Sequence, residues 1–335
     1  MLTYTIRRLV LSVPTLLFIA LVIFLLLELA PGDPMAQVPL TVPPEVKAQM
    51  REALGLGEPI HIRFWKWLVQ FFWIEPQVLI DHVFGTSFSD GKLRVISWQH
   101  RSPVMDVVVE RLPQTLWVVG TAYVVGVLIA LPIGIYSAYR QYSVFDQAGT
   151  FVTMVGYSMP PFFTGPLVIF IFSVQLGWFP FIYDTTHRVT DWDSFIVQIK
   201  QMIMPVMVLA LQTTAQISRY MRAAMLDNLG QDYVRTARAK GLSEGVVVMV
   251  HVLRNSMIPV VTVIALGMPA IFGGAIITEQ VFSVNGIGAQ LIGAIKANDL
   301  PTVQTLTFIF AVLIVAANLL ADVLYGLLDP RIRYD

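Results

Sequence analysis

Long apolar stretches alternate with shorter polar segments along most of this chain of 335 residues. A helix needs about 20 consecutive apolar residues to cross a bilayer, and the chain contains six stretches of that length. They cover residues 9–29, 114–138, 150–176, 202–221, 257–278 and 303–327. Each stretch is continuously apolar, whereas the strands of a membrane β-barrel would alternate. The pattern therefore predicts an all-α integral membrane protein with six transmembrane helices.

The polar segment after the first stretch is predicted to form a small external helical insertion. Pro43-Pro44-Glu45 begins a helix that runs through Leu54, and Gly55 and Gly57 end it. A second, aromatic-rich helix is expected at about 59–74; its rings suit the membrane–water interface better than stacking on a substrate. We divide the chain into four parts: 1–30 (N-terminus and first helix), 31–102 (external subdomain), 103–327 (five-helix core with the loop 222–256) and 328–335 (tail).

Composition narrows the function classes. The chain is 56% hydrophobic and 13% charged, against about a quarter charged for a soluble domain, so the lipid bilayer is its main environment. A formal net charge of zero gives no support to nucleic-acid binding. The chain has no cysteine, which excludes disulfides and thiolate metal sites. No nucleotide-binding P-loop, H-E-x-x-H or G-x-S-x-G motif occurs, and the five histidines are scattered. We therefore predict neither a catalytic nor a metal site.

The distribution of basic residues predicts the orientation. One set of short loops and termini carries most of them: Arg7, Arg8, Arg140, Arg219, Arg222, Arg235, Arg238, Lys240, Arg254, Arg331 and Arg333. The opposite short loops carry only Arg188, Lys200 and Lys296. Because cytoplasmic loops are enriched in Lys and Arg, both termini and the loop 222–256 are expected in the cytoplasm.

Asp322 is a carboxylate near the inner end of the last stretch, and such a group normally finds a partner inside the protein. We expect a structural ion pair with Arg219 or Arg222. A proton relay is the less favoured alternative.

Two groups of residues are candidates for a substrate path. Gln212, Thr213 and Gln216 make the fourth stretch the most polar, and Gly273 and Gly274 lie in the fifth. The polar side chains could instead bond between helices, and the glycines could serve close helix contact. The sequence leaves these alternatives open.

A polar island separates the fourth and fifth stretches. Residues 231–240 suit a short helix that Gly241 would end in a left-handed cap. Helical spacing places Tyr233, Thr236, Ala237 and Lys240 on one face and Arg235, Arg238 and Leu242 on another. Small residues let a partner approach closely, which favours docking of a cytoplasmic partner over adhesion to anionic lipid.

The island also carries a family resemblance. Thr236-Ala237, three residues and Gly241 resemble the Glu-Ala-Ala-x-x-x-Gly loop of membrane subunits in type I ABC importers, with Arg235 in place of the glutamate. The run from Asp232 to Gly241, followed by His251-x-Leu-Arg-Asn-x-x-x-Pro259, is similar to the dipeptide, oligopeptide and nickel permease family. Further matches are Leu29-Ala-Pro-Gly-Asp-Pro34, Glu279-Gln-Val-Phe282 and Gly286-Ile-Gly288.

The resemblance implies the six-helix permease fold of type I ABC importers and a place in the bacterial inner membrane. It implies four partners: a second, homologous permease, two cytoplasmic ATPases and an external substrate-binding protein. The ATPases would use ATP and Mg²⁺, while this chain would bind no cofactor. They would dock on the coupling helix, here Asp232, Tyr233, Arg235, Thr236, Ala237, Arg238, Ala239, Lys240, Gly241 and Leu242.

The implied cargo is di- or oligopeptides, with nickel, glutathione, opines or glycosides as alternatives. Two rival classes are an ATP-independent secondary transporter and a membrane anchor that transports nothing. The first would need a relay of ionisable groups in mid-membrane, and Asp322 lies too near one end.

Overall fold

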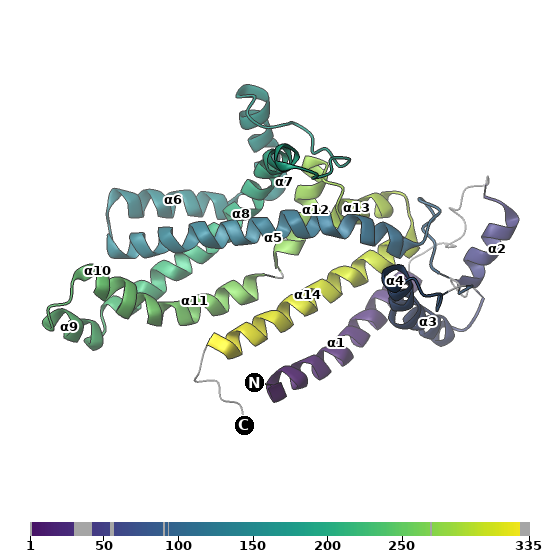
Figure 1. Cartoon of the computed structure of the whole chain (residues 1–335), viewed down its shortest axis with the longest axis horizontal. Coiled ribbons are helices and arrows are strands. Elements are labelled where there is room, and N and C mark those ends of the chain that lie inside the picture. Colours follow the sequence, from purple (N-terminus) through teal and green to yellow (C-terminus); the bar gives the residue numbers. More distant parts are fainter. Residues whose placement is uncertain are drawn as a thin grey trace. The chain divides into compact units, whose positions relative to one another are not determined.

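The computed structural model describes residues 2–29, 42–53, 57–89, 91–92, 94–268 and 270–328. Over these ranges the regular structure is helical, with one isolated β-bridge between Ile96 and Pro103 (Figure 1). The all-α prediction is therefore confirmed for this part of the chain.

The helices follow one another along the whole sequence. They are α1 (Leu2–Glu28), α2 (Pro44–Ala53), α3 (Ile60–Val69), α4 (Glu75–Phe84), α5 (Val104–Tyr139), α6 (Val144–Ser158), α7 (Pro161–Val168), α8 (Trp192–Leu229), α9 (Asp232–Ala239), α10 (Glu244–Val246), α11 (Leu253–Gly267), α12 (Ala270–Phe282), α13 (Ile287–Lys296) and α14 (Leu300–Leu328). Three π-helical segments join neighbouring helices: η1 (Gln70–Ile74), η2 (Ile169–Gln175) and η3 (Val247–Val252).

The second helix predicted after the first apolar stretch is longer than expected. Helices α3, η1 and α4 follow one another without a break, so the helical stretch ends at Phe84 rather than near residue 74. Gly85 ends it in the left-handed conformation, with φ of 68° and its N–H bonded to the carbonyl of Asp81. A glycine in this position is a common helix stop, and Gly85 is the signal that the expectation overlooked.

Among the described residues, five helices are long and apolar enough to cross a bilayer. The sixth predicted span, at 150–176, is not straight: α6 and the helix from Pro161 to Gln175 meet at 111°. The bend falls at Met159 and Pro160. Because proline has no N–H to donate and restricts the residue before it, two successive prolines break the helical ladder here. Counting the bent pair as one span gives six.

The predicted span at 257–278 is also divided. The apolar helical stretch begins earlier, at Glu244, and ends at Gly267. It stops just before Pro269, which has no N–H to continue the helical ladder. Helix α12 then starts separately at Ala270. The boundaries of this span were therefore predicted wrongly.

By its internal contacts the chain forms two compact units. Unit 1 comprises residues 1–12, 114–289 and 313–335, and unit 2 comprises 13–113 and 290–312. The limits lie inside helices such as α5 and α14. The predicted division into 1–30, 31–102, 103–327 and 328–335 stays a prediction.

Unit 1 is organised around α8, which packs against α6, α7, α11 and α12. Its approach to α5 is close: a Cβ on Gly126 would lie 2.8 Å from Cβ of Thr213, and one on Gly134 would lie 2.6 Å from Cβ of Met221. Glycine is therefore required at both crossing points, as is usual for tightly packed membrane helices.

Unit 2 contains an aromatic cluster formed by α1, α3, η1 and α14. Phe24, Trp67 and Phe308 are buried in it, and Phe64 and Phe71 pack alongside. The rings of Trp67 and Phe308 meet edge-on at 5.2 Å, a favourable aromatic geometry. Other tryptophans of the same stretch, Trp65 and Trp73, remain exposed. The aromatic helix therefore serves two purposes, core packing and an exposed surface.

The segment before α5 is attached to α14 within unit 2. Asp299 is fully buried and precedes α14 directly. Its carboxylate accepts hydrogen bonds from Ser97 Oγ at 2.5 Å, Thr302 Oγ1 at 2.7 Å and the N–H of Gln99 at 3.2 Å. Because these donors satisfy the buried charge, Asp299 fixes both the loop and the start of the helix.

Candidate functional site

Helix α9 is the predicted coupling helix. It lies at the end of α8, next to α10 and the start of the α11 helix (Figure 1). Gly241 follows it with φ of 76°. The N–H of Gly241 donates to the carbonyl of Arg238 at 2.9 Å, and the N–H of Leu242 donates to the carbonyl of Ala237 at 3.4 Å. The predicted left-handed cap at Gly241 is therefore confirmed.

Two residues attach α9 to the rest of unit 1. Val234 is fully buried and Ala237 is 5% exposed, and both belong to an apolar cluster with Met221, Met225 and Val247. Burying a valine side chain contributes roughly 1.5–3 kcal/mol. The prediction that placed Ala237 on the docking face was wrong, because spacing alone could not show that positions 234 and 237 are the inward pair.

The remaining side chains of α9 form its free surface. Those of Asp232, Tyr233, Arg235, Thr236, Arg238, Ala239 and Lys240 are exposed, as are Gly241 and Leu242 beyond the helix. Arg238 is held by Glu244, with Nη2 to Oε1 at 2.6 Å and Nε to Oε2 at 3.1 Å. This hydrogen bond raises the pKa of Arg238. The surface is thus small and basic, and its helix is anchored by buried side chains. These properties suit docking of another protein.

A second contact holds α8 to the start of α6 close to this helix. Asp146, which is 3% exposed, accepts Nε of Arg222 at 2.7 Å and Nη2 at 2.8 Å. Its carboxylate also accepts the N–H of Tyr142 at 3.0 Å. Such a bidentate pair is geometrically specific. It joins two segments that are far apart in sequence.

The prediction that Asp322 pairs with Arg219 or Arg222 was wrong. Asp322 pairs with Arg8 at 3.0 Å, and Arg222 is engaged by Asp146. Arg219 lies over the ring of Tyr157, with its Cζ 4.5 Å from the ring centre. Partner choice depends on which helices are neighbours, and the sequence did not show that the first helix supplies the cation.

The candidate path residues divide into two kinds. Thr213 is buried against Gly126, and its hydroxyl donates to the carbonyl of Leu209 at 3.4 Å, so its side chain packs where α5 and α8 cross. Gln212 and Gln216 are only half-buried on α8. Gly273 and Gly274 lie in α12, which packs against α7 and α8. The path itself remains a prediction.

A buried carboxylate lies in the last turn of α12. Glu279 is 1% exposed and accepts Thr115 Oγ1 at 2.6 Å and the N–H of Ala289 at 3.0 Å. A Cβ on Gly286 would lie 2.3 Å from Cδ of Glu279, and one on Gly288 2.8 Å from Oε2. The Gly-Ile-Gly sequence thus makes room for a carboxylate, which explains why glycine occupies both positions.

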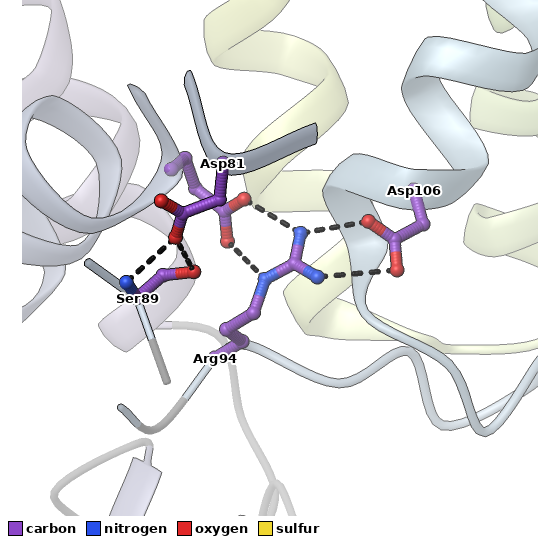
Figure 2. Close-up of polar contacts among 5 residues, drawn as sticks. Asp81, Ser89, Arg94 and Asp106 are labelled. Carbon is purple, nitrogen blue, oxygen red and sulfur yellow. Dashed lines mark hydrogen bonds and ion pairs between the residues drawn. The ribbon is translucent and has the colours of Figure 1, made fainter. Parts of the chain in front are cut away.

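Unit 2 carries a second charged network (Figure 2). Arg94 binds Glu75 through Nη2 at 2.7 Å and Nε at 3.2 Å, and Asp106 through Nη2 at 2.8 Å and Nη1 at 3.1 Å. Burial opposes the charge on Arg94, but the two carboxylates raise its pKa. The residues border a cavity of about 720 Å³ whose walls include Phe71, Pro76 and Met105.

Asp81 closes a nearby loop in the same unit. It accepts the N–H and hydroxyl of Ser89 at 2.7 and 2.5 Å (Figure 2). It also accepts the N–H of Phe88 at 2.9 Å. Burial opposes ionisation, but these bonds and one from Thr86 hold the pKa of Asp81 well below its usual range. The loop after α4 is therefore organised around one carboxylate.

Comparison with known protein families identifies this architecture. Residues 130–334 match the model of the binding-protein-dependent transport system inner membrane component, and residues 1–119 match the N-terminal model of the same membrane components. The chain belongs to this family. We refer to it below as the permease.

Curated relatives resemble the permease over its entire length. The oligopeptide transport system permease protein AppB of Bacillus subtilis is 37% identical over 338 residues, covering 100% of both chains. The glutathione transport system permease protein GsiC of Salmonella typhimurium is 36% identical with the same coverage. The resemblance of the sequence to ABC importer permeases is thus confirmed.

Two solved structures share the fold. The MetNI methionine ABC transporter, in an inward-facing form, matches with a TM-score of 0.52 and 17% identity, over 67% of the permease and 97% of that chain. An amino acid ABC transporter matches with a TM-score of 0.51 and 14% identity, over 65% of the permease and 92% of that chain. The predicted type I importer fold is confirmed by this likeness.

Sequence reasoning missed three of the permease's polar contacts. Asp146 follows Ser143 by three residues, and Ser143 caps α6, a recognisable helix start. Glu279 and Arg94 had no comparable local signal, because their partners come from distant segments. All three are structural groups that hold the helices and loops in place.

Proposed function

We propose that the permease forms half of the membrane path of an ATP-driven, binding-protein-dependent importer for di- or oligopeptides. The observation that carries this is α9, a short basic helix with an exposed face and two buried anchors. The oligopeptide permease and glutathione permease named above favour small peptides as cargo, and glutathione is the alternative. Nickel, opines and glycosides have no comparable support here.

In this proposal the permease works with four partners. A second permease would complete the path, two ATPases would bind the α9 surfaces from the cytoplasm, and an external binding protein would deliver the peptide. ATP and Mg²⁺ would be bound by the ATPases, and the permease itself would bind no cofactor and catalyse no reaction. Both termini would lie in the cytoplasm of a bacterial cell, because the basic residues concentrate on that side.

Coupling would be mechanical. Val234 and Ala237 bind α9 to the apolar cluster that also contains residues of α8, η3 and α11. Packed interiors transmit displacement because they deform little. A movement of the ATPases that displaces α9 would therefore move α8 and α11 with it, and alternating access to the path would follow.

The proposal is tested by reconstituting the permease with its partner subunits in proteoliposomes. Peptide uptake should require ATP, both ATPases and the loaded binding protein. Uptake driven by a proton gradient without ATP would contradict it, and so would a complete absence of peptide transport.

A matched pair of variants tests docking on α9. Ala239→Glu adds a carboxylate to the exposed face of α9, while Ala148→Glu adds one to an exposed position in the second turn of α6. The first should abolish binding of the ATPases to the inserted permease, and the second should preserve it. Equal binding by both variants would refute docking on α9.

A further inference from the structure

Arg219 is held in an unusual way for a cation within a candidate membrane helix, α8 (Trp192–Leu229). Its Nε donates to the carbonyl of Ala215 at 3.1 Å, and its guanidinium stacks over Tyr157 of α6 at 4.5 Å. Two contacts thus fix the plane of the group. Arginine has five N–H donors, and four of them, on the two Nη atoms, have no acceptor among the described residues.

The side chain points away from the charged end of α8. Arg222, one turn further along, binds Asp146 at that end. Arg219 instead reaches back towards Ala215, which lies about 10 Å from Arg222 along the helix axis at 1.5 Å per residue. A basic side chain near a membrane boundary usually extends towards the water and the lipid headgroups. Arg219, which is exposed, instead runs back along α8 towards Ala215.

Polar side chains continue from Arg219 along the same face of α8. Gln216 and Gln212 precede it by three and seven residues, the spacing that places side chains in one helical row. Both amides are half-buried. The row therefore presents two amides and one oriented cation along one face of α8.

Nearby carboxylates do not neutralise Arg219. In the described part of unit 1, Asp146 is bound by Arg222, Asp322 by Arg8, and Glu244 by Arg238. A cation in a membrane helix normally finds a partner. The open Nη edge of a guanidinium matches a carboxylate, with which it can form two parallel hydrogen bonds.

We infer that Arg219 is a binding residue for a carboxylate of the transported peptide, with Gln216 and Gln212 as polar contacts along the path. This inference rests on the proposed function and adds a recognition site to it. A free C-terminal carboxylate is common to ordinary peptides, so one such site could serve peptides of many sequences. Tyr157 positions the guanidinium and makes no contact of its own with the carboxylate.

The test compares one peptide as its free acid and as its C-terminal amide. ATP-driven uptake is measured in proteoliposomes that contain the whole importer, with binding protein loaded beforehand with each peptide. The wild-type complex should prefer the acid. Arg219→Gln should lower uptake of the acid about tenfold, the effect of losing one charged hydrogen bond, and should leave the amide almost unchanged.

Control variants separate this role from a general loss of charge or structure. Arg254→Gln removes another exposed cation of unit 1 and should keep the wild-type preference. Tyr157→Phe retains the stacked ring and should also retain the preference for the acid, whereas Tyr157→Leu should weaken that preference. ATPase stimulation by loaded binding protein reports whether each variant assembles.

Lipid composition distinguishes the other anion that could bind here, a headgroup phosphate. If Arg219→Gln changed uptake only in liposomes with anionic lipid, and equally for acid and amide, the inference would be overturned. An unchanged preference for the acid in an assembled Arg219→Gln complex would also overturn it. A wild-type complex that moves neither peptide removes the proposed function itself.

Discussion

The Arg222–Asp146 pair offers a quantitative test of how α6 and α8 of the permease are held together. Arg222→Met removes the cation and leaves Asp146, at 3% exposure, with only the N–H of Tyr142 as a donor. Removing one partner of a fully buried pair costs about 3–5 kcal/mol. The side chain of Arg222 is 28% exposed, so water reduces the loss, and we expect about 3 kcal/mol.

A double-mutant cycle isolates the pair from other effects. Asp146→Asn keeps the shape of the side chain and should cost about 2 kcal/mol, and the double variant should cost less than the sum of the two, with a coupling of about 2 kcal/mol. The permease is purified in detergent and unfolded by adding SDS in steps, which measures the free energy of unfolding of each variant. The exposed pair Asp232–Arg235, whose side chains are 96% and 76% exposed, serves as the matched control and should show no coupling.

Transport adds a second readout of the same pair. If it holds α6 and α8 together while α9 moves, Arg222→Met should lower the peptide transported per ATP hydrolysed more than it lowers ATP hydrolysis. A coupling energy below about 0.5 kcal/mol, within the usual additivity error, would refute the structural role. Unchanged transport per ATP in a destabilised variant would refute the mechanical one.

Three further substitutions have expected outcomes. Gly241→Ala forces a side chain into a left-handed conformation and should cost about 1 kcal/mol of unfolding free energy, whereas Gly245→Ala, with open space and no positive φ, should cost nothing measurable. Gly286→Ala places a methyl group 2.3 Å from a carboxyl carbon and should lower thermal stability and transport sharply, while Gly293→Ala should preserve both. Arg94→Met leaves a buried glutamate unpaired and should lower the melting temperature of the purified permease; an unchanged value would contradict the role assigned to that network.

Local features were the part of the structure that the sequence predicted well. The short helix before Gly241 and its end at that glycine were both predictable, because helix capping involves only neighbouring residues. Continuous apolar length indicated where the membrane helices are. The bend at Met159–Pro160 was missed because prolines also occur inside intact membrane helices, so their presence does not decide between a kink and a break.

Features that depend on distant neighbours were predicted poorly. Asp322 could have paired with any of several cations, and only the packing of α14 beside the start of α1 selects Arg8. Thr213 carries the same hydroxyl whether it lines water or packs against glycine; the close crossing at Gly126 decides between them. In each case the residue type was informative, but the partner was set by the tertiary structure.

The cradle formed around Glu279 has a genetic consequence. Gly286 cannot accept a methyl group because the carboxylate of Glu279 already occupies the space. The steric conflict in Gly286→Ala is therefore with the side chain of Glu279. Shortening Glu279 to alanine should therefore act as a second-site suppressor of Gly286→Ala, restoring part of the transport that the glycine change removes. A selection for regained growth on peptide, started from the Gly286→Ala strain, should yield changes at position 279, although the two positions are not adjacent in the chain.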